Sequence, residues 1–294
     1  MAEIDVPKSQ QKMLFIPDTM ESWPYERAFN RNYDEAVAES RAWFSRYTHF
    51  TKQFDFYDDL ERCDHCSAFR FGLISRGFSS VAETSPGLIC ALMYPNISKG
   101  MPDQSWKIFE MKFALEGLRW SIDLIQFFLF LDEYTDLKPV SFVEDKVNLV
   151  LDAANHPYKP RPEGEEPLGQ MAQECVHPPS HVPYSYYVLF PSVFQLALRI
   201  STENAGKHFI KTFVQYLESL VKQAKNRVND SVNTLEEFFH NRRLNSGTAP
   251  SYVPVELDLN LPDEVFYHPA IKEMELLAID MICVDNVSFN DQMS

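Results

Sequence analysis

The chain is poor in glycine and in basic residues, and it has no long uninterrupted hydrophobic run. Its 294 residues include 9 Gly, and 27 Lys and Arg stand against 42 Asp and Glu, for a formal net charge of -15. So acidic a chain lacks the basic surface that nucleic-acid binding requires. The longest apolar stretch, around 124–131, is interrupted by Gln126 and is too short to cross a bilayer. We therefore expect no nucleic-acid partner and no membrane insertion.

Cysteine is also scarce, and its five positions follow no complete disulfide or metal-binding pattern. The number is odd and the N-terminus lacks the charged-then-apolar order of a signal peptide, so free thiols in a cytoplasmic protein are expected. Cys63 and Cys66 enclose His65 in half of a zinc pattern, but a structural zinc needs four ligands. No second CxxC or HxxxH follows, so we expect no zinc site.

No segment alternates apolar and polar residues in the way of a half-buried strand, so the sequence predicts an all-α fold without internal repeats. Helical patterns cover the following ranges: 32–50, 64–93 with a break near 85–87, 104–131, 192–244 and 269–294. Within them, Thr234 and Glu237 form a capping-box pattern. Gly247 is expected to end a helix and Pro269 to open the last one.

Two stretches are expected to lack regular structure. The first 30 residues are rich in proline and polar residues and predict an extended arm over a globular body of residues 31–294. Residues 156–183 form the clearest loop, which is either a lid or an ordered surface excursion. With 23 Phe and 13 Tyr in the chain, the body can enclose a large apolar core or an aromatic-lined cavity.

The most informative segment, FFLFLDEYTD, ends at Asp136 and runs from apolar residues directly into carboxylates. On a helix, Asp132 and Asp136 share one face, about one turn apart, with Glu133 beside them. Acidic residues at a helix C-terminus oppose its dipole, so they are mildly unfavourable there without a cation. Magnesium prefers oxygen ligands and bridges carboxylates to phosphates. The segment therefore predicts a metal-diphosphate site at the rim of a deep apolar pocket, with a solvated helix end or a cap before Pro139 as the alternative.

Two further groups of polar residues suit the same chemistry. Arg243 lies four residues before Gly247, and arginine binds phosphate oxygens through several fixed donors. In the last predicted helix, Asn286, Asn290 and Ser294 are each four apart, so their oxygen-bearing side chains share a face. A basic helix end favoured by the dipole and a frayed polar terminus are the respective alternatives.

Together these features resemble the class I terpene synthases, in particular the fungal, basidiomycete-like sesquiterpene synthases. The resemblance covers roughly residues 60–294 and rests on D-E-x-x-D at 132–136, R-x-x-S-G at 243–247, and ELDLNLPDEVFYHPAI leading into an A-x-D-M-I helix. It implies a single-domain α-helical bundle of the isoprenoid synthase type around a deep apolar pocket. It also implies a lyase of fungal secondary metabolism, a monomer or homodimer, that ionises farnesyl diphosphate and cyclises the carbocation to a sesquiterpene hydrocarbon or alcohol.

The resemblance also assigns roles to individual residues. Three magnesium ions with the diphosphate are implied, and part of that cluster is held by the first acidic motif: Asp132, Glu133 and Asp136. Arg243 is the implied diphosphate sensor, Gly247 lies at the helix break that triggers ionisation, and Ser246 links the two. Candidate pocket-wall residues, for which plain core is the alternative, are the following aromatic residues: Trp120, Phe127 and Phe128.

The second metal motif departs from the family pattern N-D-x-x-S-x-x-x-E. Literal matching places it at Asn290, Asp291 and Ser294, with the Glu four residues beyond the last residue. Counting forward from Arg243 favours Asn286 as the first ligand, with Asn290 and Ser294 in the positions of the Ser and the Glu. Neither register completes the motif, and the family's later helices with an Arg-Tyr pair do not follow. The expectation is therefore a C-terminally truncated chain.

Two other functions compete with the cyclase. A prenyl-chain elongating transferase would share the fold but needs a second D-D-x-x-D motif. The other acidic cluster, Asp58-Asp59-Leu60-Glu61, lies upstream on a polar segment. A non-catalytic helical binding or scaffold paralogue is favoured by the incomplete second metal motif. The intact first motif and Arg243 oppose that interpretation.

Overall fold

In a computed structural model, the described residues are 30–47, 94, 107–156, 159–175, 202–228, 234–256, 259 and 261–293. Of residues 107–114, 175 and 285–293 only the backbone is described. Every regular element in these ranges is a helix, which confirms the predicted all-α class. The predicted arm at 1–30, save Asn30, lies outside the described residues, as do the predicted helices at 64–93. The same holds for the half zinc pattern and the upstream acidic cluster: 63–66 and 58–61.

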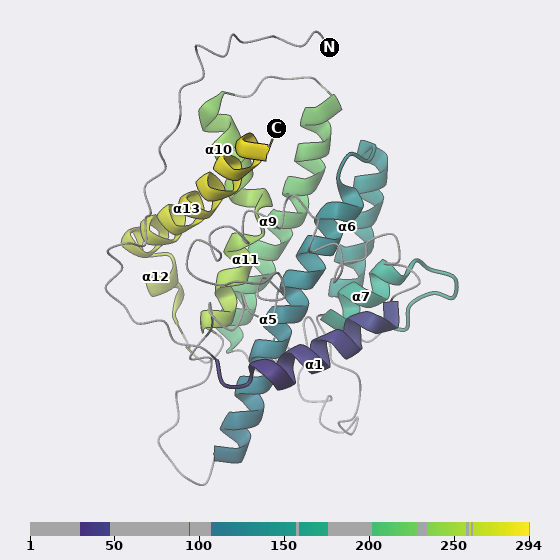
Figure 1. The fold of residues 1–294 in the computed structure, drawn as a ribbon, viewed down its shortest axis with the longest axis vertical. Coiled ribbons are helices and arrows are strands. Elements are labelled where there is room, and N and C mark those ends of the chain that lie inside the picture. Colours follow the sequence, from purple (N-terminus) through teal and green to yellow (C-terminus); the bar gives the residue numbers. More distant parts are fainter. Residues whose placement is uncertain are drawn as a thin grey trace.

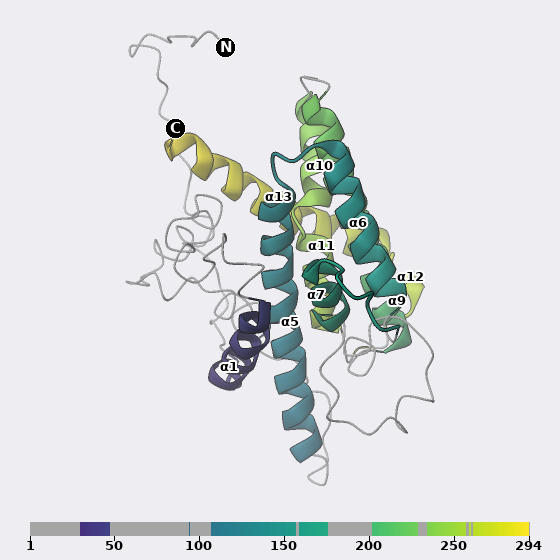
Figure 2. The ribbon, with the colours of Figure 1, turned by 90° about the vertical axis from the view of Figure 1, so that its right-hand side faces the viewer.

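The helices are arranged around one long central element (Figure 1). In chain order they are α1 Tyr33–Phe44, η2 Ser45–Tyr47, α5 Lys107–Thr135, α6 Val140–Asn155, α7 Pro167–Cys175, α9 Glu203–Val228, α10 Leu235–Asn245, α11 Thr248–Tyr252, η6 Val253–Glu256, α12 Asp263–Phe266 and α13 Pro269–Met293. Helix α1 lies on one side of α5, and α6 and α7 lie on the other (Figure 2). Helix α9 packs against α6 and α10, and α10 also contacts α13.

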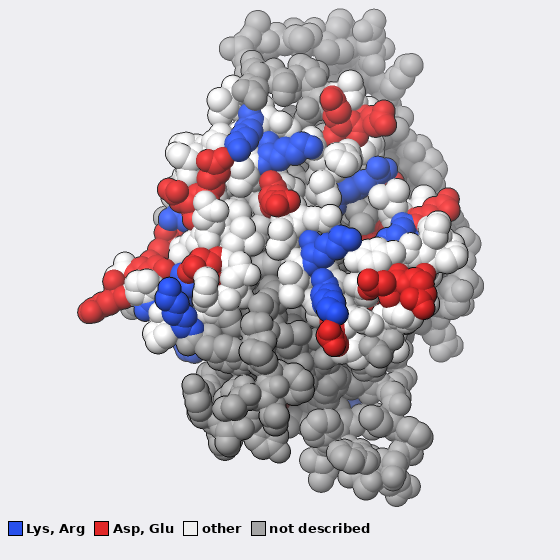
Figure 3. All heavy atoms as spheres, turned by 180° about the vertical axis from the view of Figure 1, so that it is seen from behind, with Lys and Arg blue, Asp and Glu red and all other residues white. Residues whose placement is uncertain are grey.

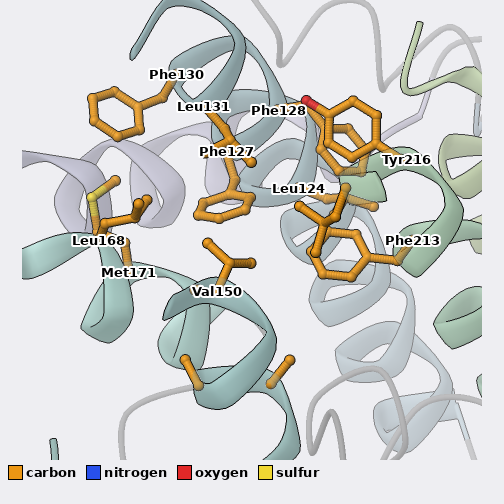
Figure 4. Close-up of a cluster of buried hydrophobic side chains, with 14 of the residues drawn as sticks. Leu124, Phe127, Phe128, Phe130, Leu131, Val150, Leu168, Met171, Phe213 and Tyr216 are labelled. Carbon is orange, nitrogen blue, oxygen red and sulfur yellow. The ribbon is translucent and has the colours of Figure 1, made fainter. Parts of the chain in front are cut away.

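The core forms around the part of α5 where apolar residues cover most of the helix circumference. Leu124, Phe127 and Leu131 of α5 are at most 2% exposed, since such a helix is stable only when other helices cover every side. The neighbouring helices supply the partners seen in Figure 4: Val150 of α6, Leu168 and Met171 of α7, and Phe213 and Tyr216 of α9. The long buried helix predicted at 104–131 is thus present, and it extends four residues further than expected, to Thr135.

A buried polar group joins α1 to α5. The carboxylate of Asp123 is 1% exposed; it accepts a hydrogen bond from Ser40 Oγ and forms an ion pair with Arg119 at 3.0 Å. Burial raises the pKa of Asp123 to about 6, although Arg119 and Ser40 oppose the shift. This group fixes the position of α1 along α5, because a slip of one residue would deprive the buried carboxylate of its hydrogen bond from Ser40.

The loop predicted at 156–183 is wrong for nine of its residues, because 167–175 form α7. Proline at the first helical position is favourable, since its missing N–H would be unpaired there in any case. Leu168, Met171 and Ala172 are buried, and their spacing of three and four is that of an amphipathic helix. In the stretch predicted as helical over 192–244, the described residues form the helices α9 and α10, with a new N-cap at Thr234.

The surface carries both signs of charge. On the face shown in Figure 3, the Lys and Arg side chains of the described residues lie among Asp and Glu and form no broad basic field. None of the described helices combines the length and the apolar character needed to span a bilayer.

Candidate metal and diphosphate site

The acidic motif occupies the last turn of α5. The backbone N–H of Asp136 donates to the carbonyl of Asp132 over 2.8 Å, so the helical path continues through both residues. Leu137 then adopts a left-handed conformation with φ of 54°, which stops the helix before Pro139 caps α6. Asp132 and Asp136 are half-buried, whereas Glu133 is exposed. The spacing therefore places the two aspartates on one face at the end of a buried helix, as predicted.

Two arginines from other helices lie near these carboxylates. Arg227, in the last turn of α9, forms an ion pair with Asp136 over 3.5 Å. Tyr216 lies below the site with its ring centroid 4.7 Å from that of Phe128. Burial raises the pKa of Tyr216 and the Asp132 carboxylate raises it further, while Arg242 of α10 opposes the shift. Both charges act on the same hydroxyl, so α5, α9 and α10 converge at this end of the bundle.

Helix α10 is held at its start by a complete capping box, which confirms the predicted motif. The Thr234 N–H donates to Glu237 Oε2 over 2.8 Å, and Thr234 Oγ1 accepts from the Glu237 N–H over 3.2 Å. Helix α10 ends at Asn245, and Gly247 follows with φ of 67° before α11 begins. A Cβ atom on Gly247 would lie 3.2 Å from Phe128 Cδ2. The predicted helix break is therefore present, and it lies directly against α5.

Arg243, on the last turn of α10, is bound by a carboxylate of α13. Its Nε–H donates to Asp280 Oδ1 over 2.5 Å, and its Nη2–H donates to Asp280 Oδ2 over 2.8 Å. The hydrogen bonds from Arg243 hold the pKa of Asp280 below its usual range. One turn further along α13, Cys283 is buried beside Ser246, Arg242 and Arg243, and burial raises the pKa of its thiol. Helix α13 therefore contacts the end of α10 directly before the helix break.

Two of the residues expected to form the second metal motif lie on the final turns of α13. The helix includes the backbone of Asn286 and Asn290, while Ser294 lies outside the described residues. By helical spacing, Asn286 and Asn290 continue the row begun by the buried Ile279 and Cys283, at steps of four, three and four. Their backbone positions therefore fall on the α13 face that contacts α10 and α11.

The three aromatic candidates for a pocket wall have different surroundings. Trp120 is fully buried, with its ring edge-on to Phe209 at 5.0 Å between centroids, and its Nε1 has no hydrogen-bond partner among the described residues. Phe127 is 1% exposed in the centre of the core. Phe128 is 6% exposed and lies beneath Gly247, in contact with Tyr216. Of the three, Phe128 is the residue that connects the core to the helix break.

The described residues fit a metal ion that is bound partly by protein carboxylates and partly by phosphate oxygens. No group of three or more His, Cys, Asp or Glu side chains in the described ranges is placed to hold an ion by itself. Asp132 and Asp136 supply hard oxygen ligands, the type that magnesium uses when substrate phosphates complete its coordination. The site is therefore suited to a metal bound together with an anion.

Three residues of this site escaped the sequence analysis: Arg227, Tyr216 and Asp280. Tyr216 belongs to an apolar stripe at spacings of three and four, so its position near Asp132 had no separate signal. Arg227 pairs with a residue 91 positions away, and no spacing rule connects them. Asp280 is the acidic residue of the A-x-D-M-I pattern, and its place within an apolar helix is a signal that calls for a buried or paired partner.

The architecture has solved counterparts. A crystal structure of the SVS_A2 protein from ancestral sequence reconstruction superimposes with a TM-score of 0.57, at 13% sequence identity, over 90% of this chain and 65% of that chain. A crystal structure of a mutant of the same protein gives a TM-score of 0.56, at 14% identity. At this level of identity the likeness concerns the fold alone. The described helices define an all-α bundle of the isoprenoid synthase fold.

The chain belongs to the terpene synthases: the family model for terpene synthase family 2, C-terminal metal binding, matches residues 123–291. It is 35% identical to Sesquiterpene synthase 14 of Postia placenta, over 97% of the chain and 66% of that relative. It is 33% identical to Delta(6)-protoilludene synthase 18 of the same fungus, over 96% of the chain and 65% of the relative. A Delta(6)-protoilludene synthase of Stereum hirsutum is 31% identical, and the chain spans 62% of its length. The chain thus spans just under two thirds of the length of each of these three relatives.

Proposed function

We propose that this chain is a magnesium-dependent sesquiterpene cyclase that ionises farnesyl diphosphate. The observation that carries the proposal is the meeting of the α5 carboxylates with positive charge: Arg227 pairs with Asp136, and Asp132 and Arg242 both act on the hydroxyl of Tyr216. Carboxylates for a metal and guanidinium groups for phosphate oxygens are the two requirements for stabilising a diphosphate leaving group. The names of the sesquiterpene synthases among its relatives support the assignment.

The polar residues around the end of α5 would neutralise the negative charge of the diphosphate. Asp132, Asp136 and the oxygen-bearing residues of α13 would hold magnesium, which supplies Lewis-acid stabilisation of the departing diphosphate when bound. Arg243 donates N–H groups to phosphate oxygens, while Arg242 and Arg227 add positive charge at the same end. As negative charge accumulates on the diphosphate, these fixed donors favour cleavage of the allylic C–O bond. The product of that step is a carbocation and free diphosphate.

The apolar side of the site would control the carbocation. Trp120, Phe127 and Phe128 present aromatic faces, which attract cationic carbon through their negative quadrupole. An apolar surrounding also excludes water, which would otherwise add to the cation and end the reaction. We assign this role first to Phe128, because it lies between the core and Gly247.

The test is incubation of the 294-residue chain with farnesyl diphosphate, with analysis of volatile hydrocarbons and of released inorganic diphosphate. With magnesium the chain is expected to form a sesquiterpene, and with a chelator it is expected to form none. Asp132→Asn should lower the rate about 100-fold or more, since it removes a carboxylate that would hold the magnesium, and the magnesium would stabilise the departing diphosphate. The matched control is Asp145→Asn, which removes an exposed carboxylate of α6.

Product formation that is unaffected by Asp132→Asn would show that the metal assignment is wrong. Absence of both products from the wild-type chain with magnesium would favour the non-catalytic paralogue. Elongated prenyl diphosphates, formed when isopentenyl diphosphate is added, would favour the transferase.

A further inference from the structure

We propose that Asp280 is a positioning residue for the diphosphate: it fixes the guanidinium of Arg243 so that the remaining N–H donors face the anion. The inference rests on the proposed function and deepens it by adding a residue of α13 to the ionisation machinery. Asp280 belongs neither to the acidic motif of α5 nor to the residues expected to form the second metal motif.

The pair of Arg243 and Asp280 has a bidentate geometry. Both carboxylate oxygens of Asp280 accept from Arg243, one from Nε–H and one from Nη2–H. An arginine side chain carries five N–H donors in a rigid plane, so three remain: both on Nη1 and one on Nη2. One on each Nη lies along the outer edge of the guanidinium, which can bind two phosphate oxygens at once. Pairing with Asp280 therefore orients the arginine and leaves its anion-binding edge available.

The guanidinium of Arg243 lies near an aromatic ring and is partly exposed to solvent. Its carbon lies 6.0 Å from the ring centroid of Phe239, one turn earlier on α10. Arg243 and Asp280 are 31% and 26% exposed, so solvent reaches the pair. Ion pairs with this exposure contribute little to fold stability, because water screens their attraction. The main consequence of the pair is thus the restricted orientation of a long, flexible side chain.

The pair connects two helices of the proposed site, α10 and α13. It joins the last turn of α10, three residues before the Ser246 cap, to a position on α13 that is six residues before Asn286. Cys283 and Ser246 meet beside it. An anion bound to Arg243 would therefore affect two elements through the Arg243–Asp280 pair. One is the helix break after α10, and the other is α13, which carries Asn286 and Asn290.

The charge of Asp280 makes the proposal easy to test, because orientation and charge have opposite effects. A carboxylate near a diphosphate repels it, so removing the charge alone would tighten binding of the anion. Loss of orientation would weaken it, because the ligand would have to order the arginine itself. Asp280→Asn keeps the size of the side chain but cannot accept both N–H donors. The sign of the change in affinity separates the two effects.

The experiment is calorimetric titration of the full 294-residue chain with inorganic diphosphate in excess magnesium. Asp280→Asn is expected to weaken binding about fivefold to tenfold, and Asp280→Glu to recover most of the loss. In an Arg243→Ala background, Asp280→Asn is expected to have no further effect, because it acts through that arginine. Glu275→Gln is the matched control: it removes a carboxylate of α13 that pairs with Lys272, and it should leave the affinity unchanged.

Unchanged or tighter binding by Asp280→Asn would overturn the positioning role. So would an equal loss in the Arg243→Ala background, since that is the result of a purely structural contact. Failure of the wild-type chain to bind diphosphate would instead overturn the proposed function on which the inference rests. Thermal unfolding temperatures of all variants, measured in parallel, show whether a loss of binding reflects loss of the fold.

Discussion

Gly247 is the residue whose conformation matters most to the helix break. Its φ of 67° lies in the left-handed region, and a Cβ atom would be 3.2 Å from the ring of Phe128. A side chain here therefore meets two separate penalties, one in the backbone and one in the contact with α5.

We predict that Gly247→Ala lowers the free energy of unfolding by about 2 kcal/mol or more, from left-handed strain plus the contact. Gly164→Ala is the matched control, because Gly164 has φ of 79° and no atom within 4 Å of the added Cβ. It should lose about 1 kcal/mol, from the backbone alone. Urea unfolding measures both, and equal losses would show that the Phe128 contact is unimportant.

Asp123 is the residue that makes stability depend on pH. Its pKa rises from an ordinary value of 3.8 to about 6 on burial, so the folded protein keeps a proton that the unfolded chain has lost in this range. Stability from this group is therefore complete below about pH 4 and is lost as pH rises through about 6. A shift of this size corresponds to about 3 kcal/mol.

We predict that Asp123→Asn removes this dependence, since an amide does not titrate. The free energies of unfolding of wild type and variant, measured by urea denaturation from about pH 4 to 7, should diverge in favour of the variant by about 3 kcal/mol as pH rises. Parallel curves would mean that Arg119 and Ser40 compensate fully for burial of the charge.

At the scale of single elements, α10 lies on the surface of the bundle with little buried area. None of its residues is fully buried, although the side chains of all of them are described. Its stability depends on the Thr234 capping box and on its contacts with α9 and α13. Helices with little buried surface depend more on their caps than buried helices do.

We predict that Thr234→Ala lowers the stability of α10 by about 1 kcal/mol, while Thr234→Ser, which keeps the capping oxygen, has little effect. Amide hydrogen exchange should become faster in 235–245 and remain unchanged in α9, which has a buried face. Equal acceleration in both helices would indicate that α10 does not open on its own.

The sequence predicted the elements whose ends are marked by a capping residue, a glycine or a proline. The capping box at Thr234, the break at Gly247 and the start of α13 at Pro269 each follow from a residue with a specific backbone requirement. Helix α7 was missed because it has only nine residues within a proline-rich stretch, so length and composition outweighed the spacing of its buried residues. Its proline at the first position and the apolar steps of three and four were the available signals.

At the scale of the whole molecule, the site is built from residues that no local pattern connects. Asp132 follows from its motif, but its proximity to Tyr216 and Arg242 depends on how α5, α9 and α10 pack. The pair of Arg243 with Asp280 joins positions 37 residues apart on separate helices. Resemblance to a family can name such residues, whereas only the tertiary structure brings them together.

The central claim is that the end of α5 binds a metal together with a diphosphate. It is tested most directly by titrating the chain with inorganic diphosphate in the presence of magnesium and again in the presence of a chelator. We predict that magnesium tightens diphosphate binding about tenfold or more, and that Asp132→Asn abolishes this coupling. Equal affinities with and without magnesium, or full coupling in the Asp132→Asn variant, would contradict the claim.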